Sequence, residues 1–282
     1  ALRINGELIF LANENPLSRD DMMGALTAMI GAEKVKEFIA TRDCDFAYTF
    51  GSDTRLRGNA SFQRGMMCLT LRLIPKAKSF DELNLPPILQ TFATRKQGFF
   101  LVVGPVGQGK STTLSALINL INKERAAHIV TVEEPIEFVY APDKSIVDQR
   151  EVGVDTKDFT TALKAVLRED VNVILIGEMR SPETIAAAVT AAETGHLVFS
   201  TLHTNNASQT IDRIIDSFPP SQQDQIRVQL SSSLLGVFSQ RLIPRINGGR
   251  VPAFELLINN NAVSNLIREK RSHEIDTVIQ TS

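Results

Sequence analysis

The sequence contains very little cysteine, the residue that forms disulfides and thiolate metal sites, and it contains no tryptophan. Its 282 residues include no tryptophan and only two cysteines, Cys44 and Cys68. Two thiols are too few for a four-thiolate zinc site or a disulfide framework, and they are typical of a protein kept in a reducing cytosol. We therefore expect both cysteines to be free and buried.

The sequence also lacks an excess of positive charge and a long apolar run. Thirty Lys and Arg residues stand against 32 Asp and Glu residues, so the formal net charge of −2 gives no reason to expect nucleic-acid binding. No apolar stretch approaches the roughly 18 residues of a membrane-spanning helix, and no charged-then-apolar leader opens the chain. The composition thus predicts a cytoplasmic protein with no transmembrane segment and no nucleic-acid partner.

The first 97 residues differ in pattern from the rest. The length and the 43% hydrophobic content favour two domains. Residues 1–74 combine short alternating strands with an amphipathic helical stretch over 19–40, which predicts a small α+β domain. Residues 75–97 contain three prolines, and because proline restricts both itself and the residue before it, we interpret this segment as an interdomain linker.

From Gly98 onward, compact apolar runs alternate with longer helical stretches. Strands are predicted over 99–103, 129–132, 173–176 and 197–200, and helices over 110–122, 159–169 and 182–193. Such alternation is typical of βαβ units around a buried, mostly parallel sheet. Residues 98–282 are therefore predicted to form an α/β domain.

A glycine-rich loop lies between the first predicted strand and helix of this domain. Its N–H groups could cradle phosphates, its lysine could add positive charge, and its serine hydroxyl could bind Mg²⁺. An ordinary glycine turn would explain neither the lysine nor the serine. We predict that this loop binds ATP and Mg²⁺ through Gly104, Pro105, Val106, Gly107, Gln108, Gly109, Lys110, Ser111 and Thr112.

Two glutamates follow later predicted strands. Glu133 follows the strand over 129–132, and Glu178 follows the strand over 173–176, with Gly177 where a Walker B element commonly has Asp. Because the carboxyl ends of parallel strands face the ligand crevice, either glutamate could polarise the attacking water, and Glu178 could also approach Mg²⁺ through its water shell. The alternatives are a solvated acidic turn and a helix-capping glutamate.

Two histidines flank the predicted strand over 197–200. An isolated histidine is more often a hydrogen-bonded core residue than a functional one. The placement of His196 and His203 at the ends of a strand near the other candidates favours a γ-phosphate sensor or a water-orienting role. We therefore include both histidines among the candidate catalytic residues.

Taken together, these motifs resemble the secretion ATPases of type II secretion and type IV pilus systems. Four segments carry the resemblance: the Walker A loop over 104–111, an Asp-box-like segment over 131–137, the run 167–170 into the atypical Walker B element, and a His box over 194–203. The resemblance implies a RecA-like P-loop motor domain preceded by a PAS-like N-terminal domain. It begins inside that N-terminal domain and stops before the last motor helices, so we expect both ends to be trimmed.

Within that family, two features resemble the PilT-like retraction ATPases of type IV pili. The tetracysteine insertion usual in assembly and secretion ATPases is absent, and residues 262–269 resemble the retraction signature but depart from it at Val263 and Ser264. The resemblance implies a homohexamer that acts on an inner-membrane pilus platform protein, with a second retraction ATPase as a further partner. An ATP-hydrolysing motor that gives twitching motility is the function expected.

The resemblance also implies arginines that act on the nucleotide from the N-terminal domain. Arg57 and Arg72 match the family's positions, and Arg55 is left undecided. A guanidinium can meet phosphate oxygens in a bidentate fork, although an exposed strand arginine is usually a solvated charge. Three alternatives stay open for the whole chain: a pilus-extension ATPase, a type II secretion ATPase, and a nucleotide-binding regulatory subunit that does not hydrolyse ATP.

Overall fold

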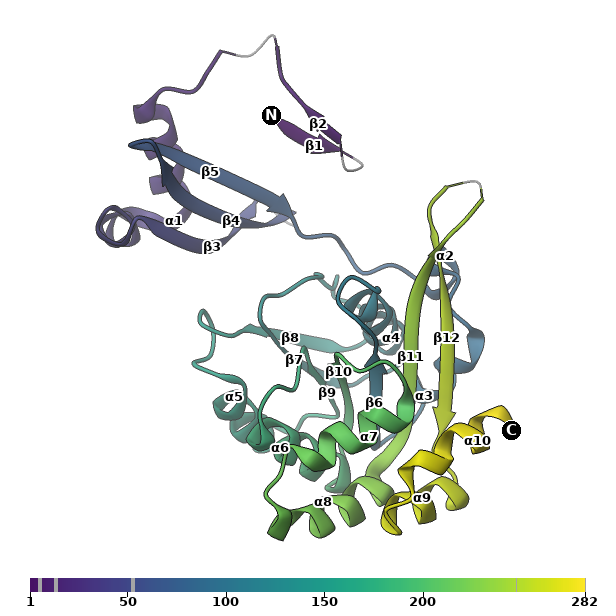
Figure 1. Ribbon diagram of the computed structural model, residues 1–282. Coiled ribbons are helices and arrows are strands. Elements are labelled where there is room, and N and C mark those ends of the chain that lie inside the picture. The colour runs from purple at the N-terminus through teal and green to yellow at the C-terminus, as the bar shows by residue number, and fades with distance from the viewer. Residues whose placement is uncertain (5–6, 13–14, 52–53, 247, 282) are drawn as a thin grey trace. The chain divides into compact units, whose positions relative to one another are not determined.

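The chain divides into two units, Ala1–Pro75 and Lys76–Ser282. The computed structural model describes residues 1–4, 7–12, 15–51, 54–246 and 248–281. No helix in these ranges is both long and apolar enough to cross a membrane. The two units are described separately below, and both are drawn in Figure 1.

Unit 1 is a small α+β unit. Strands β3 (Asp43–Phe50), β4 (Thr54–Gln63) and β5 (Met66–Leu73) form an antiparallel sheet in that order. Helix α1 (Arg19–Thr41) packs on it through a core that includes Leu26, Phe38, Phe46 and Met67. Strands β1 (Leu2–Ile4) and β2 (Glu7–Ile9) pair with each other in a separate two-stranded sheet.

Local chemistry sets where α1 begins and where it bends. Ser18 caps its first turn, accepting from the Asp21 N–H while the Asp21 carboxylate accepts from the Ser18 N–H, which satisfies two groups that a helix end leaves unpaired. Gly31 has φ of 81° and interrupts the helical backbone, a conformation that glycine adopts without a Cβ penalty. The two cysteines are free, as expected, but partly exposed rather than buried.

Unit 2 contains a seven-stranded sheet. All neighbours in it are parallel except β11 and β12. Because β6 lies beside β10, and β10 beside β9, the carboxyl ends of these strands meet at one edge of the sheet. The strand order is β12 (Arg250–Ile258), β11 (Leu234–Pro244), β6 (Gly98–Val103), β10 (Leu197–Leu202), β9 (Val173–Ile176), β7 (His128–Glu133) and β8 (Ile146–Glu151).

Helices cover both faces of this sheet (Figure 1). Alternate residues of β6 show the two layers, because Leu101 joins one core cluster and Phe100 the other, as expected for a period of two. Helix α4 (Lys110–Glu124) packs on the Phe100 side together with α2 (Phe80–Leu83), the 3₁₀ helix Pro87–Leu89 and α3 (Gln90–Ala93). The opposite face carries α5 (Phe159–Val166), α6 (Pro182–Glu193), α7 (Ala207–Asp216), α8 (Pro220–Ser233), α9 (Asn261–Arg268), the 3₁₀ helix Ser272–Glu274 and α10 (Ile275–Gln280).

The α/β class predicted from the sequence is confirmed, but the expected linker over 75–97 is not a simple connection. The boundary between the units falls after Pro75. Beyond it, Phe80, Leu89 and Phe92 are buried in the same cluster as residues of α4. The segment from Lys76 onward is therefore part of unit 2, because its apolar side chains complete the core under α4.

Candidate active site

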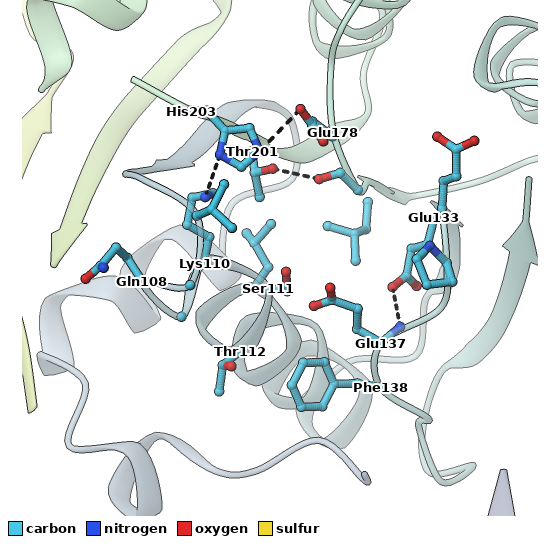
Figure 2. A pocket seen from close by; sticks show the side chains of 18 of the residues that line it. Gln108, Lys110, Ser111, Thr112, Glu133, Glu137, Phe138, Glu178, Thr201 and His203 are labelled. Atoms are coloured by element: carbon cyan, nitrogen blue, oxygen red, sulfur yellow. Dashed lines mark hydrogen bonds and ion pairs between the residues drawn. The ribbon is translucent and has the colours of Figure 1, made fainter. Parts of the chain in front are cut away.

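The P-loop joins β6 to α4 at the carboxyl edge of the sheet. Strand β6 is fully buried, and Gly107 and Gly109 have φ of 77° and 80°, a backbone conformation that residues with a Cβ rarely adopt. A cavity of about 390 Å³ opens beside this loop, and Figure 2 shows Gln108, Lys110, Ser111 and Thr112 around it. This volume is within the range of small-molecule sites.

Lys110 is buried at the first turn of α4, and its ammonium has three acceptors. Nζ donates to the carbonyl oxygens of Gly104 at 2.8 Å and Pro105 at 2.9 Å, and lies 3.1 Å from His203 Nδ1. Burial lowers the pKa of Lys110, while the charges of Glu178 and Glu137 oppose that effect. These contacts hold the ammonium at the edge of the cavity. The phosphate oxygens of a bound nucleotide would replace these acceptors.

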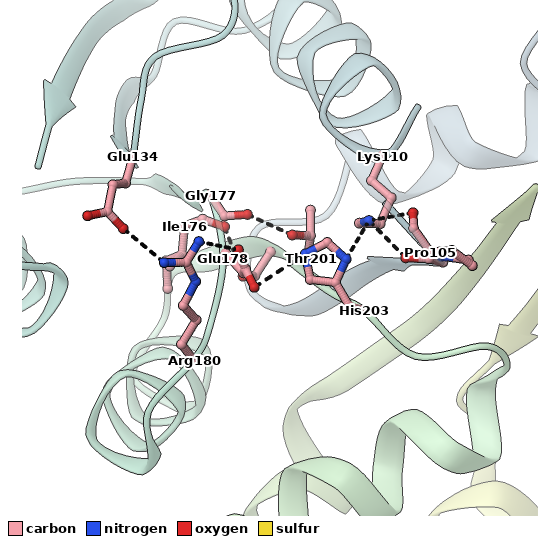
Figure 3. Close-up of polar contacts among 11 residues, drawn as sticks. Pro105, Lys110, Glu134, Ile176, Gly177, Glu178, Arg180, Thr201 and His203 are labelled. Carbon is pink, nitrogen blue, oxygen red and sulfur yellow. Dashed lines mark hydrogen bonds and ion pairs between the residues drawn. The ribbon is translucent and has the colours of Figure 1, made fainter. Parts of the chain in front are cut away.

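His203 connects Lys110 to Glu178, as Figure 3 shows. Its Nε2 lies 3.3 Å from Glu178 Oε1. An ammonium has only donors, so Nδ1 accepts from Lys110 and a neutral imidazole carries its proton on Nε2, which donates to the carboxylate. These residues follow β6, β10 and β9, three neighbouring strands, and form a continuous polar chain.

The second oxygen of Glu178 binds Arg180. Arg180 Nη2 donates to Glu178 Oε2 at 2.9 Å, and Nη1 donates to Glu134 Oε2 at 3.3 Å. Burial alone would raise the pKa of Glu178, but the hydrogen bond and charge of Arg180, joined by His203, outweigh it and lower the pKa. Glu178 is therefore an ionised carboxylate at neutral pH.

Glu133 lies at the end of β7 in a very different environment. It is 7% exposed, its Oε1 accepts from the Thr131 hydroxyl at 2.7 Å, and its Oε2 accepts from the Glu137 N–H at 3.3 Å. Burial raises the pKa of Glu133 to about 7, against the opposing effect of these hydrogen bonds. Glu133 contributes to the cavity lining, and its raised pKa means that it holds a proton more readily than Glu178 does.

The ends of β7 and β9 approach each other closely at Gly177. Its N–H donates to the Val132 carbonyl at 2.8 Å, and its own carbonyl accepts from the Thr201 hydroxyl at 2.7 Å. A Cβ at this position would lie 3.3 Å from the Glu133 Cα and 3.4 Å from the Val132 oxygen. A side chain here would therefore require the backbone of the neighbouring strand to shift by a few tenths of an ångström.

The remaining predicted site residues fall in three places. Ser111 and Thr112 line the cavity, together with Val106 of the loop. His196 lies at the opposite end of β10, where its ring Nδ1 is 3.0 Å from the Ala191 carbonyl oxygen. Six strand residues span about 20 Å, so the expectation that both histidines act at the nucleotide is corrected for His196: of the two, His203 lines the cavity.

Arg57 and Arg72 lie in unit 1, on adjacent strands. They are directly opposite each other across β4 and β5, and both are exposed. Neither forms an ion pair with a residue in the described ranges. Like charges directly opposite on a sheet are unfavourable, so this pair has no structural benefit within its own sheet. Arg55, by contrast, donates to the Thr49 hydroxyl at 3.0 Å.

Several cavity residues were not predicted from the sequence. Arg180 follows the Walker B carboxylate by two positions and could have been suspected from that spacing. Leu242 and Arg250 come from β11 and β12, whose sequences carry no motif for phosphate binding. Other lining residues outside the predicted motifs are Leu114, Phe138, Tyr140, Phe159 and Leu175.

The residues present suit a nucleotide triphosphate with its metal. The loop contains two left-handed glycines, a conformation in which successive backbone N–H groups can form an anion-binding concavity, and the ammonium of Lys110 is buried at the first turn of the helix that follows. In the described part of the chain, no group of three or more His, Cys, Asp or Glu side chains is placed to hold a metal ion alone. Mg²⁺ is commonly held by one or two protein groups together with substrate phosphates, and the lining of the cavity offers such groups in Ser111 and Glu178.

Comparisons with known proteins identify the family of the chain. A family model described as type II/IV secretion system protein matches residues 66–249. The twitching motility protein of Neisseria gonorrhoeae is 44% identical, over 99% of this chain and 75% of that protein. The chain belongs to the type II/IV secretion ATPase family. The type IV pilus retractation ATPase PilT of Pseudomonas aeruginosa is 42% identical to this secretion ATPase, over 99% of the chain and 81% of the relative.

A solved structure supports the same assignment for the fold. The crystal structure of the pilus retraction motor PilT and bound ADP superposes on this secretion ATPase with a TM-score of 0.93. The two are 46% identical, and the match covers 99% of this chain and 82% of that chain. The secretion ATPase described here therefore shares both the fold and the nucleotide-binding character of its family.

Proposed function

We propose that this secretion ATPase hydrolyses ATP to drive the retraction of type IV pili, and so supports twitching motility. Two relatives that match nearly the whole chain have names that refer to this activity. We further propose that it works as a cytoplasmic homohexamer beside the inner membrane, on the pilus platform protein, with a second retraction ATPase as a further partner.

The observation that supports ATP hydrolysis is the polar chain from Lys110 through His203 to Glu178. Lys110 and the loop N–H groups would bind the β and γ phosphates. Glu178, ionised and fixed on both oxygens, would orient and deprotonate the attacking water. Mg²⁺, held by the Ser111 hydroxyl and through water by Glu178, would offset charge on the departing phosphoryl group.

His203 would report phosphate binding to the carboxylate. A phosphate oxygen that withdraws Lys110 from Nδ1 frees that nitrogen, while Nε2 continues to donate to Glu178. The His203 ring would then reorient between the phosphate and the carboxylate. In this arrangement Glu133 supports the site through its contacts on β7 rather than acting as the base.

We propose that Arg57 and Arg72 offset negative charge on the phosphoryl group during transfer. The support is their exposed, mutually opposed placement on β4 and β5 and the guanidinium's fit to phosphate. Each single change to Ala is expected to lower kcat by up to about 10³-fold, the lower range for an arginine of this kind. Phosphate release from the purified ring measures this, with Arg55→Ala as the matched control. Full activity of the double variant would remove both arginines from the mechanism.

The decisive experiment for the proposed function combines catalysis with assembly. Purified protein is expected to release phosphate from ATP and to appear as a hexamer by native mass spectrometry or electron microscopy, whereas Lys110→Ala assembles without activity. ATP binding without turnover by the wild type would instead favour a regulatory subunit.

The direction of force needs a cellular readout. Deletion of the gene is expected to leave pili in excess and to abolish twitching, because pili are then assembled but not withdrawn. Loss of pili on deletion would favour an extension ATPase, and loss of protein export without a pilus phenotype would favour a type II secretion ATPase.

A further inference from the structure

A buried glutamine on β11 forms a hydrogen bond to the main chain of the P-loop. Gln240 is 2% exposed, and its Nε2 donates to the main-chain carbonyl oxygen of Gln108 at 2.6 Å. Its Oε1 accepts from the Thr113 hydroxyl of α4 at 2.6 Å. One side chain of β11 therefore holds both the loop and the first turns of the helix that follows.

The orientation of this amide is determined by its partners. A main-chain carbonyl can only accept a hydrogen bond, so the NH₂ group of Gln240 must face Gln108. Its oxygen then faces Thr113, whose hydroxyl has to be the donor. Thr113 is 1% exposed, and so neither amide group has bulk water as an alternative partner.

A second contact fastens the same loop residue to the same strand. The Leu242 N–H donates to Gln108 Oε1 at 2.7 Å. Gln108 is thus held to β11 by its main chain and its side chain. Glycine is needed on both sides of this contact: a Cβ at Gly109 would lie 2.8 Å from Gln240 Nε2, and one at Gly104 would collide with the Gln240 carbonyl oxygen.

The geometry of the peptide group links this contact to the nucleotide. The Gln108 carbonyl and the Gly109 N–H belong to one trans peptide group, so they point in opposite directions. A carbonyl held toward β11 turns the following N–H away from β11, toward the cavity. We propose that Gln240 is a positioning residue that aims the Gly109 N–H at a nucleotide phosphate by holding the Gln108 carbonyl.

This role predicts a loss in binding rather than in the chemical step. The N–H groups of the loop contact phosphates in ATP and in ADP alike, so a rotated peptide weakens both. Loss of one hydrogen bond to a charged group corresponds to about tenfold or more in affinity. Gln240→Met, which keeps the volume without the donor, is expected to raise KM for ATP and Kd for ADP by about that factor, with a smaller change in kcat.

Gln240→Glu gives a readout that a purely structural role would not move. An ionised carboxylate has no donor and repels the Gln108 carbonyl, but a protonated carboxyl can donate to it. The ADP affinity of Gln240→Glu, divided by that of the wild type, is therefore expected to rise as the pH falls, whereas the ratio for Gln240→Met stays constant. The titratable groups that line the cavity are common to all three proteins and cancel in this ratio: Lys110, Glu133, Glu134, Glu137, Tyr140, Glu178, Arg180, His203 and Arg250.

Gln223→Glu is the matched control. Gln223 lies in the first turn of α8, outside the cavity lining, and its Nε2 donates to the Phe218 carbonyl at 3.1 Å. The same chemical change there should therefore leave ADP affinity unchanged at every pH. The experiment titrates a fluorescent ADP analogue into each full-length variant, with thermal unfolding to confirm folding. Gln240→Glu with wild-type affinity at pH 8, or with a ratio independent of pH, would overturn the inference.

The inference rests on the proposed function for the identity of the ligand, and the two can fail separately. Absence of ADP binding in the wild type would contradict the proposed function. Binding by the wild type together with unaltered binding by both Gln240 variants would contradict only the role of Gln240. Should Gln240→Met fail to fold, the pH dependence of Gln240→Glu decides alone.

Discussion

The ends of β9 and β7 each carry a glutamate at the edge of the nucleotide cavity, and their environments differ sharply. Glu178 is bound by Arg180 and His203, which keep it ionised. Glu133, on the neighbouring strand, is buried among neutral donors, and its pKa is raised to about 7. The comparison teaches that position at a strand end does not by itself identify the base, because the surrounding charges decide which carboxylate is available.

The largest expected effect separates the two glutamates in catalysis. Glu178→Gln should lower kcat by at least about 10²-fold, as for removal of a positioned base, while nucleotide binding is retained. Glu133→Gln is the matched change on the neighbouring strand, and it should cost far less. Phosphate release and nucleotide titration on both variants measure the difference. Equal losses of kcat in the two variants would show that the different environments of the two glutamates do not give them different roles in catalysis.

The next effect is on stability. The pKa of Glu133 is raised from 4.5 to about 7 by burial, so in this interval the folded protein binds more protons than the unfolded chain. Its contribution to stability is then fully present below about pH 4.5 and is lost as the pH rises to about 7, up to about 3 kcal/mol.

This linkage is measured by comparison with Glu133→Gln. The free energy of unfolding of the wild type, minus that of the variant, should decrease between about pH 4.5 and pH 8 and stay level above that. Chemical denaturation at several pH values measures the difference. A flat difference would mean that folding does not raise the pKa of Glu133, and the contrast with Glu178 would disappear.

The smallest expected effect concerns the group that keeps Glu178 ionised. Arg180→Met removes the hydrogen bond and charge that lower the pKa of Glu178, so that pKa rises and the acid limb of the kcat profile moves to higher pH. At about pH 8 the rate should stay within a few-fold of the wild type, because Arg180 is largely exposed. An unchanged profile would show that another group sets the acid limb.

The sequence predicted four of the seven strands of the large sheet, namely β6, β7, β9 and β10, and few of the finer contacts. Strand β9 and helix α6 have the bounds expected from apolar runs and from Pro182 at a first helical turn. These elements are specified by local pattern. Residues 75–97, which pack under α4, were interpreted as a linker because the interpretation considered their prolines and not their apolar residues. Phe80 and Phe92 show no helical period over so short a stretch, and they are buried only because α4 lies above them.

The candidate site also contains residues that local sequence pattern predicts and residues that it does not. The P-loop, Glu178 and His203 lie next to strand ends, where chain order and parallel pairing bring them together. Gln240 is about 130 residues beyond the loop it holds, and no local pattern indicates that pairing. His196 shows the opposite error, because it was given a role at the nucleotide although it lies before β10, at the end of that strand away from the cavity.

The close approach at Gly177 has a consequence for how such sites are recognised. Its position is the one where an aspartate is often expected, and a search that requires a carboxylate there would overlook this chain. The missing side chain suits the packing here, because a Cβ would meet the main chain of β7 more closely than most Cβ contacts do. An Asp engineered at this position would therefore require the end of β7 to shift by a few tenths of an ångström, and the distance between Glu133 and Glu178 would change with it.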